Sequence, residues 1–368
     1  MNETILTWLV FILAFGGLVL IHEFGHFIVA RLCKIEVEEF GIGLPTPGAL
    51  TLFTWQGTRF TLNWLPLGGF VRPKGENDPN VPGGLAAASP WQRLAVLFAG
   101  PLMNLLAAVL IYSIIFGRVG VPDSTRVLVS SVVEGGPAAQ AGFQADDIFI
   151  SGNDQPIRNY DELRVIVDAN ESKPVVFVVD RHGEQVELTA TPLMNSEAER
   201  IMIGVGLGVP FKQSTSPVET LSLGARYTYL NIRAIIALPA QMIRGTLDSE
   251  QSRLVGLKGI FDVLQQTVSR DVQVTTTAPA STDPIDQPVR TLELIASLSI
   301  SLGLFNLFPF PALDGGRIIF VLPELIFRKR VSPQLENLVH GMGMAFLLLL
   351  MIYINVMDFV NPINVIIP

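Results

Sequence analysis

Four stretches of this chain are long and apolar enough to cross a lipid bilayer as helices. They cover residues 5–30, 94–116, 292–312 and 338–360. A hydrocarbon core about 30 Å thick is crossed by about 20 residues of helix, and each stretch reaches that length. The chain is also 49% hydrophobic and only 16% charged, which is too apolar for an ordinary soluble protein. We therefore expect a polytopic α-helical membrane protein with about four transmembrane helices.

Basic residues indicate which parts of the chain face the cytoplasm. Lysines and arginines gather between the first and second apolar stretches and between the third and fourth, whereas neither terminal tail carries any. The positive-inside rule then places both of those loops in the cytoplasm and both termini outside. The first stretch is expected to be a retained span, because its start lacks the basic head and the cleavage site of a signal peptide. The net charge of -8 argues against a nucleic-acid partner.

The first apolar stretch contains the sequence HEFGH, residues 22–26. On a helix, His22 and His26 lie one turn apart on one face, where both can reach a single metal ion, and Glu23 projects beside them. Zinc accepts two imidazoles and a third protein ligand and leaves one position for water, for which Glu23 can act as general base. Hydrogen bonding between helices is the alternative for the histidines. Because ionisable groups inside a membrane are costly, we favour a metal site.

A third ligand is expected in NLFPFPALDGGR, residues 306–317. Pro309 and Pro311 forbid a regular helix just before Asp314, and the two glycines after it allow a close approach of backbone. Irregular backbone at membrane depth is tolerated where it lines a cavity or is buried in protein. A helix cap at the membrane surface is the alternative role for Asp314, and His340 is the alternative third ligand. Two histidines and a carboxylate also suit divalent ions other than zinc.

A soluble domain is predicted over residues 121–212. The segment RVLVSSVV reads as a strand, Asn159 and Glu162 have the spacing of a capping box, and a hairpin is expected to turn at His182-Gly183. With GGPAAQAGFQADDIFISGND at its centre, this order resembles a PDZ domain of bacterial membrane proteases. A generic small α/β module is the alternative. The positive-inside rule places this domain outside the cytoplasm.

Residues 213–290 are predicted to hold amphipathic surface helices and a flexible linker. Arg226, Arg233 and Arg244 fall on one face of a helix, which favours a position along the membrane surface rather than a fifth span. Residues 270–290 are polar and rich in proline, and we expect them to form the mobile linker. Two regions complete the predicted organisation, with the first two spans in 1–120 and the last two in 291–368.

The combination of motifs resembles the site-2 protease family of intramembrane zinc metalloproteases over nearly the whole chain. HEFGH in the first span, AGPLMN in the second, the PDZ-like insert and NLFPFPALDGG in the third carry this resemblance. The resemblance implies a Zn2+ cofactor held by His22, His26 and Asp314, with Glu23 as the catalytic residue. It further implies positions that hold the substrate, which are Asn104, Asn306, Pro309 and Pro311.

The resemblance also implies what such an enzyme cleaves and where. The substrates would be single-span membrane proteins, cut in their transmembrane segments during regulated intramembrane proteolysis after another protease has trimmed them. The enzyme would reside in the lipid bilayer of the bacterial cytoplasmic (inner) membrane, with the PDZ-like domain outside the cytoplasm. Residues 58–76 are similar to the family's membrane-re-entrant β-hairpin, whose edge can receive an unwound substrate. An ordinary cytoplasmic hairpin is the alternative for this stretch.

Some features depart from the family's pattern, and one rival function stays open. The chain has one PDZ-like domain, whereas better-known bacterial members have two, and RLVGLKGIFDV stands where many relatives have a Gly-Pro-rich segment. The PDZ-like domain could capture a new substrate C-terminus or exclude bulky ectodomains. The rival function is a catalytically silent membrane adaptor with a structural metal. Structural zinc sites close all four positions with protein ligands and have no use for Glu23, so the enzyme is favoured.

Overall fold

The computed structural model describes residues 3–195, 200–214, 216–245, 254–277 and 287–361. The chain forms two compact units. One unit comprises Met1–Arg118 with Ser216–Pro368, and the other comprises Val119–Thr215.

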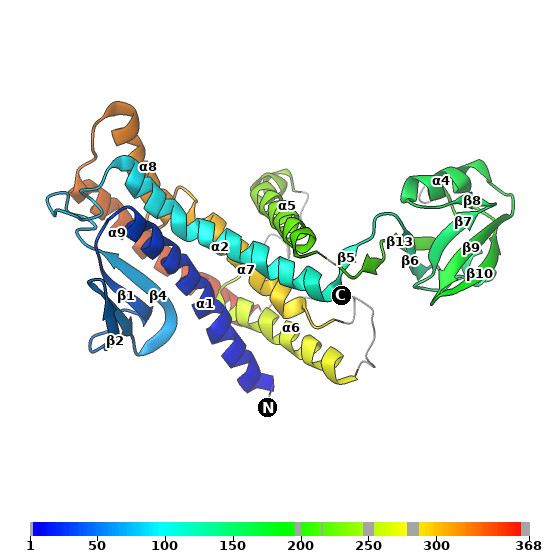
Figure 1. The fold of residues 1–368 in the computed structure, drawn as a ribbon, viewed down its shortest axis with the longest axis horizontal. Helices are drawn as coiled ribbons and strands as arrows, with labels where there is room; N and C mark the ends of the chain where they lie inside the picture. Colours follow the sequence, from blue (N-terminus) through cyan, green and yellow to red (C-terminus); the bar gives the residue numbers. More distant parts are fainter. Residues whose placement is uncertain (1–2, 196–199, 215, 246–253, 278–286, 362–368) are drawn as a thin grey trace. The chain divides into compact units, whose positions relative to one another are not determined.

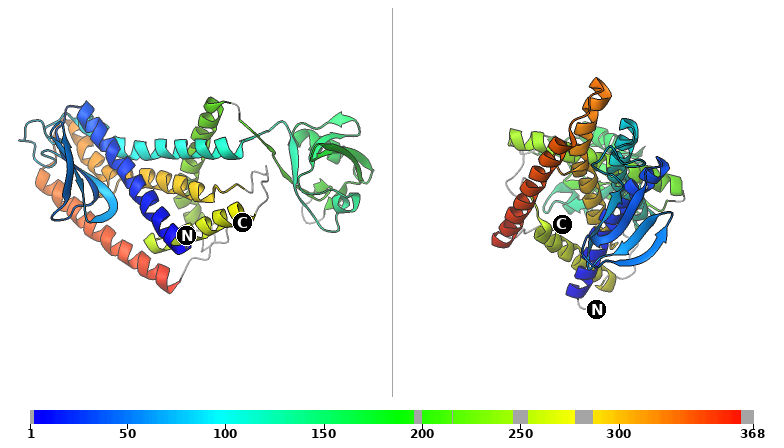
Figure 2. Two further views of the ribbon diagram at one scale, coloured as in Figure 1. Left: turned by 60° about the horizontal axis from the view of Figure 1, so that its bottom comes forward. Right: turned by 90° about the vertical axis from the view of Figure 1, so that its left-hand side faces the viewer.

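Three helices of the described chain are long and apolar enough to cross a membrane. These are α1 (Glu3–Leu32), α2 (Pro90–Val119) and α9 (Pro333–Val360). The third predicted span, 292–312, is instead a shorter helix of 17 residues, α7 (Arg290–Asn306), which is followed after a break by α8 (Asp314–Phe327). The break lies at the prolines, whose rings cannot continue a helix. In Figure 1 and in the left view of Figure 2, α7 runs beside α2.

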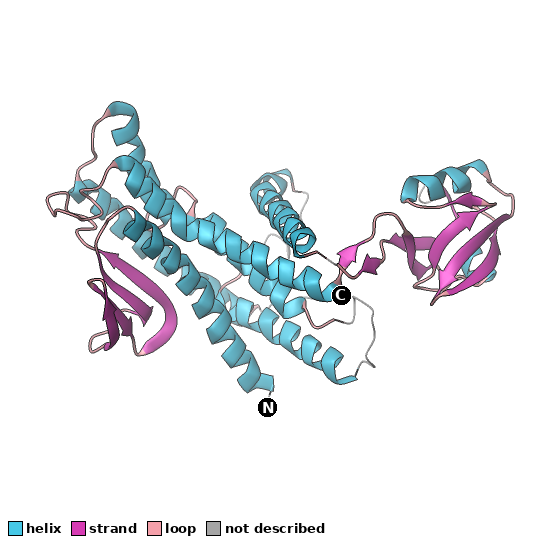
Figure 3. Ribbon diagram, viewed as in Figure 1, coloured by secondary structure: helices cyan, strands magenta, loops and turns pink. Residues whose placement is uncertain are grey.

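A four-stranded sheet packs beside α1 (Figures 1 and 3). Its strands are β1 (Val37–Leu44), β2 (Leu50–Trp55), β3 (Thr58–Leu62) and β4 (Leu65–Pro73), in the order β2-β3-β1-β4. The predicted hairpin over 58–76 is wrong, because β3 and β4 do not pair. Both flank β1, which runs parallel to β3 and antiparallel to β4. The hairpin is formed by β2 and β3 and turns at Gln56 and Gly57, which both have positive φ.

The sheet is apolar on the face toward α1 and polar on the other. Phe40 of β1 and Phe60 of β3 pack with Phe27 of α1 in a buried cluster. On the other face Glu39 is buried, and its carboxylate accepts from Arg72 at 3.0 Å. This alternation fixes the register of the sheet, since a slip of one residue would turn the phenylalanines away from α1.

Helix α5 (Pro217–Arg244) is the helix predicted at the membrane surface. It is not among the described helices that are long and apolar enough to cross a membrane. It packs on α2, where the Tyr227 ring lies 4.7 Å from the Phe116 ring. Gly224 permits this approach, because a Cβ there would overlap the backbone of Val109.

Helix α6 (Leu257–Thr277) occupies part of the predicted linker. The linker prediction is therefore wrong over residues 270–277, and residues 278–286 lie outside the described part of the chain. Leu264 and Val268 of α6 are buried against Phe11 of α1. This packing stabilises a helix that the composition of the segment alone does not indicate. The buried Asp358 of α9 accepts bonds from amides at the start of α6, at 2.8 and 3.1 Å.

The unit Val119–Thr215 is built on a sheet whose described strand pairs are all antiparallel, with two short helices. The sheet order is β10-β9-β7-β6-β13, with β8 paired to β7. These strands are β6 (Val127–Val132), β7 (Ile148–Gly152), β8 (Gln155–Pro156), β9 (Val175–Arg181), β10 (Glu184–Ala190) and β13 (Val205–Gly208). The remaining elements are the helices α3 (Pro137–Ala141) and α4 (Tyr160–Ala169), and the short strands β5 (Val121–Pro122), β11 (Leu193–Asn195), β12 (Arg200–Met202) and β14 (Phe211–Lys212).

Local predictions for this unit are confirmed. Asn159 caps α4 by accepting from the Glu162 amide at 2.9 Å. The β9–β10 hairpin turns at His182 and Gly183, which both have positive φ. The fully buried Asp147 forms a two-pronged pair with Arg181, at 2.7 and 2.8 Å, and these bonds raise the pKa of the guanidinium.

Candidate metal centre

Two histidines reach the metal centre because α1 and α2 cross closely. His22 and His26 are buried on one face of α1, at 6% and 8% exposure. A Cβ on Gly25 of α1 would overlap the Ala99 carbonyl of α2. A Cβ on Gly100 would lie 2.7 Å from His22 Nε2 and would also overlap His26 Nε2. Only glycine at both positions lets the two helices meet with the imidazoles between them.

Asp314 comes to the same place from the start of α8. Residues 307–313 contain no regular helix, as the two prolines predict. Gly315 and Gly316 lie against carbonyl groups of this segment, and a Cβ on either would overlap them. The predicted close approach of backbone at the two glycines is therefore confirmed, and it turns the first residue of α8 toward α1.

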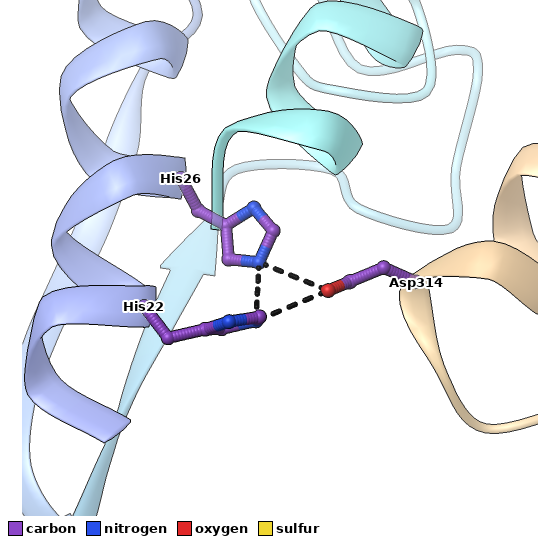
Figure 4. Close-up of side chains that lie close together, drawn as sticks. All are labelled: His22, His26 and Asp314. Carbon is purple, nitrogen blue, oxygen red and sulfur yellow. Dashed lines mark hydrogen bonds and ion pairs between the residues drawn. The ribbon is translucent and has the colours of Figure 1, made fainter. Parts of the chain in front are cut away.

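The three side chains form a triangle of ligand atoms (Figure 4). His22 Nε2 lies 3.1 Å from Asp314 Oδ2 and 3.1 Å from His26 Nε2, and His26 Nε2 lies 3.4 Å from Asp314 Oδ2. Three atoms bound at about 2.0–2.1 Å to one tetrahedral zinc ion would be about 3.3 Å apart. The triangle therefore has the size that zinc requires, and these residues can hold it.

Hydrogen bonds at the far ring nitrogens orient both imidazoles. His26 Nδ1 donates to the Val96 carbonyl at 2.7 Å, which leaves the Nε2 lone pair free for a metal. His22 Nδ1 lies 3.1 Å from the Asn104 side-chain amide. Asn104 is completely buried and is held by Ser299, which donates to its backbone carbonyl at 2.7 Å. Asn104 thus lies behind a ligand and not on the substrate side, where the sequence analysis expected it.

A cavity of about 460 Å³ opens at the ligand triangle. Glu23 lines it together with His22, His26, Asp314 and Asn306. Its Oε2 accepts a bond from the Val71 amide of β4 at 3.0 Å, so the catalytic carboxylate predicted from the sequence faces the same space as the ligands. Of the two predicted substrate prolines, neither Pro309 nor Pro311 is among the described residues that line this cavity.

His340 takes no part in the ligand group. Its Nδ1 accepts a hydrogen bond from the Ala312 amide at 2.8 Å, and the group of potential ligands consists of His22, His26 and Asp314. The alternative that replaces Asp314 by His340 is therefore wrong. His340 instead touches the segment that carries Asp314.

Sequence reasoning missed the groups that orient the site residues. The carbonyl of Val96 and the amide of Val71 are backbone atoms, and no residue type marks them in a sequence. Gly100 belongs to the motif AGPLMN. A glycine in the middle of an apolar helix often marks a close packing contact, and this could have indicated the role of Gly100.

Comparison with known proteins identifies similar chains over almost the whole length. The family model described as peptidase family M50 matches residues 10–350. A Clostridium perfringens protein with zinc metalloprotease in its name is 30% identical, over 96% of this chain and 98% of its own length. Metalloprotease MmpA of Caulobacter vibrioides is 29% identical, over 91% of this chain and 90% of its own. The probable protease eep of Enterococcus faecalis is 26% identical, over 96% and 98%.

Proposed function

The chain belongs to peptidase family M50, the site-2 protease family, and from this premise we propose that it is a zinc metalloendopeptidase that cleaves other membrane proteins within their transmembrane segments. The observation that carries the proposal is the triangle formed by His22, His26 and Asp314 on apolar helices, in one cavity with Glu23. The enzyme is an integral membrane protein with three apolar helices of spanning length in its described part.

The proposed metal ligands are His22, His26 and Asp314. A zinc ion held by these residues would polarise a peptide carbonyl as a Lewis acid and would lower the pKa of bound water. The chain supplies the orientation, since Val96 holds His26 with Nε2 turned to the metal. Asn104 Nδ2 lies 3.1 Å from His22 Nδ1, and Asn104 Oδ1 has no partner within the described residues. A half-turn of the amide exchanges these two atoms, and in that orientation Oδ1 accepts the Nδ1 proton and leaves Nε2 of His22 free for a metal.

Glu23 is the proposed general base and acid. Its carboxylate lines the cavity and can take a proton from the attacking water and deliver it to the leaving amine nitrogen. The Val71 amide holds one carboxylate oxygen at 3.0 Å, and the other oxygen is left to exchange the proton. Structural zinc sites have no use for such a residue, and family membership supports the enzyme over the silent adaptor.

The substrate is proposed to bind as an extended strand along the free edge of β4. In the described sheet β4 pairs only with β1, and the Val71 amide points away from β1 toward Glu23. Alternate amides of a strand point to one side, so the same edge offers further donors and acceptors beside the cavity. Strand addition would compensate for the helix hydrogen bonds that a transmembrane substrate loses on unwinding. Asn306, which lines the cavity, is the proposed substrate contact on the opposite wall.

The unit Val119–Thr215 is proposed to be a PDZ-like domain that captures a substrate end outside the cytoplasm. A groove of about 80 Å³ lies between α4 and the strands β12 and β13. Strand β13 is the last in its sheet, so a peptide can add to it with side chains in this groove. Arg200 lines the groove and suits a terminal carboxylate, while Arg164 beside it pairs with Asp168 at 3.3 Å. The proposed setting is the bacterial cytoplasmic membrane, with a single-span substrate already trimmed by another protease.

Two substitutions test the assigned roles. Glu23→Gln is expected to keep zinc and to lose cleavage by about 10²- to 10⁴-fold, because it removes only the proton transfer. Asp314→Ala is expected to lose both zinc binding and cleavage, because two histidines alone hold zinc weakly. Zinc content is measured on the purified proteins, and cleavage is measured by gel with a single-span substrate in proteoliposomes. Undiminished cleavage by the Glu23 variant, or full zinc content in the Asp314 variant, contradicts the assignment.

A further inference from the structure

The segment that carries Asp314 has a conformation that needs outside support. Residues 307–313 contain no regular helix. The amides of this segment bond to carbonyls two or three residues back, with one exception, the Ala312 amide, whose bond goes to another helix. Ala312, two residues before Asp314, has a φ of 78°, in the left-handed region that residues with a Cβ seldom occupy. Such a residue persists only where its surroundings determine its conformation.

Helix α9 supplies contacts at this point. His340 Nδ1 accepts the hydrogen bond of the Ala312 amide at 2.8 Å. Gly343, three residues further along α9, is buried, and a Cβ there would lie 2.7 Å from the carbonyl oxygen of Pro311 and would overlap the proline ring. Two adjacent residues of the segment are thus held by one face of α9.

A third contact continues the same face. The ring of Phe346 lies 5.7 Å from the ring of Phe310. Positions three apart on α9 therefore meet consecutive residues of the segment in reverse order. We call this face the α9 ladder, and it consists of His340, Gly343 and Phe346.

The ladder distinguishes this part of α9 from the rest of the helix. Most of α9 is exposed, and its buried residues in the described chain are Gly343 and Asp358. Asp358 binds the start of α6, near the far end of α9. A helix that served only as a membrane anchor would not need a hydrogen bond to the irregular segment between α7 and α8.

We propose that the α9 ladder positions the third metal ligand, by holding residues 310–312 in the conformation from which Asp314 reaches His22 and His26. This inference rests on the proposed ligand set. His340 is then a positioning residue whose required feature is the acceptor at Nδ1, and Gly343 is a position where the absence of a Cβ is required.

Two glycines of α9 provide a matched pair of variants. Gly343→Ala pushes a Cβ into Pro311, whereas a Cβ on Gly341 meets nothing within 4 Å. Zinc affinity is measured on the full-length protein in detergent by competition with a chelator. We expect Gly343→Ala to weaken zinc binding ten- to a hundredfold, which is the usual effect of losing a group that orients a metal ligand, and Gly341→Ala to leave it unchanged.

A second pair tests the hydrogen bond itself. His340→Ala removes the acceptor and is expected to weaken zinc binding by about tenfold, whereas the Oδ1 atom of His340→Asn can take the place of Nδ1 and is expected to restore most of the affinity. Thermal unfolding with and without zinc separates positioning from general packing. If the ladder positions the ligand, zinc raises the unfolding temperature less in Gly343→Ala than in Gly341→Ala. The same difference is expected between His340→Ala and His340→Asn.

Normal zinc affinity in both Gly343→Ala and His340→Ala would overturn the inference, and so would an equal loss in Gly341→Ala and Gly343→Ala. Asp314→Ala is measured alongside. If it binds zinc normally, the proposed ligand set fails, whereas a loss in Asp314→Ala alone leaves the ligand set intact and removes only the role of α9.

Discussion

At the scale of single residues, the metal site depends on where side chains are missing as much as on where they are present. Gly100 lies against the Nε2 atoms of both histidines, so that backbone of α2 forms the back wall of the site. A methyl group there would occupy the space in which the imidazoles converge. The helix itself would accept the change, since alanine favours a helix over glycine by about 1 kcal/mol.

We therefore predict that Gly100→Ala loses zinc while α2 stays folded. The expected loss of zinc affinity is at least about tenfold, because the Cβ would displace His22 and His26 together. Chelator competition on the purified protein measures the loss, and circular dichroism checks the helix. Gly117→Ala in the same helix is the control, since its Cβ meets nothing within 4 Å. Equal zinc binding by the two variants would contradict the prediction.

The residues of the proposed site could be named from the sequence, and their orientation could not. His22, Glu23 and His26 could be assigned because helical spacing alone brings them together, and Asp314 because ionisable groups on apolar helices are rare. The role of Asn104 could not be predicted, because its partner His22 lies 82 residues away and only the crossing of α1 and α2 brings them into contact. Asn104 is completely buried beside His22, and we propose that it supports this ligand rather than contacting the substrate.

At the scale of elements, strand β4 contacts the proposed catalytic residue Glu23 and also provides the proposed substrate edge. The Val71 amide is directed to Glu23 and not to β1, so it can be removed without loss of a bond between the strands. Proline is tolerated on edge strands when its nitrogen faces away from the neighbouring strand. This position therefore allows a selective test.

Val71→Pro is predicted to reduce cleavage by about 10- to 100-fold, because a carboxylate displaced by about 1 Å transfers its proton poorly. Zinc content is expected to stay normal, since the ligand side chains do not change. Turnover of a single-span substrate in proteoliposomes and metal analysis provide the two measurements. Val71→Ile, which keeps the amide, serves as the control, and wild-type turnover of the proline variant would refute the proposed role.

The predictions for elements succeeded where local chemistry decides and failed where packing decides. The capping box at Asn159 and the turn at His182 are short-range features. The strand order β2-β3-β1-β4 is not, because β1 inserts between two strands that are neighbours in sequence. The polar residues 270–277 form helix because α6 packs on α1, which no composition rule anticipates.

At the scale of the whole molecule, the residues of the proposed metal site and the proposed PDZ-like domain belong to different compact units. The sequence predicts a domain over 121–212, and the second compact unit is Val119–Thr215. That unit has its own core, in which Phe149 and Phe177 are almost fully buried. Every proposed zinc ligand belongs to the other unit, so the chemistry and the substrate capture can be separated by deletion.

Deleting residues 125–210 is predicted to leave zinc binding unchanged and to abolish cleavage of all substrates, because the proposed capture of the chain end is lost. Metal analysis of the deletion variant serves as the control for an intact site. Cleavage of trimmed and untrimmed single-span substrates is compared by gel. If untrimmed proteins become substrates instead, the domain excludes bulky ectodomains and the capture proposal is wrong.

Two of the proposed metal ligands, His22 and Asp314, are separated by 292 residues of sequence. A ribosome that adds 5–20 residues per second needs about 15 to 60 s to travel from His22 to Asp314. During that interval the histidines are already made while their third partner does not yet exist. On the proposed ligand set, the metal site stays incomplete until Asp314 has been made, so proteolysis can begin only after most of the chain exists.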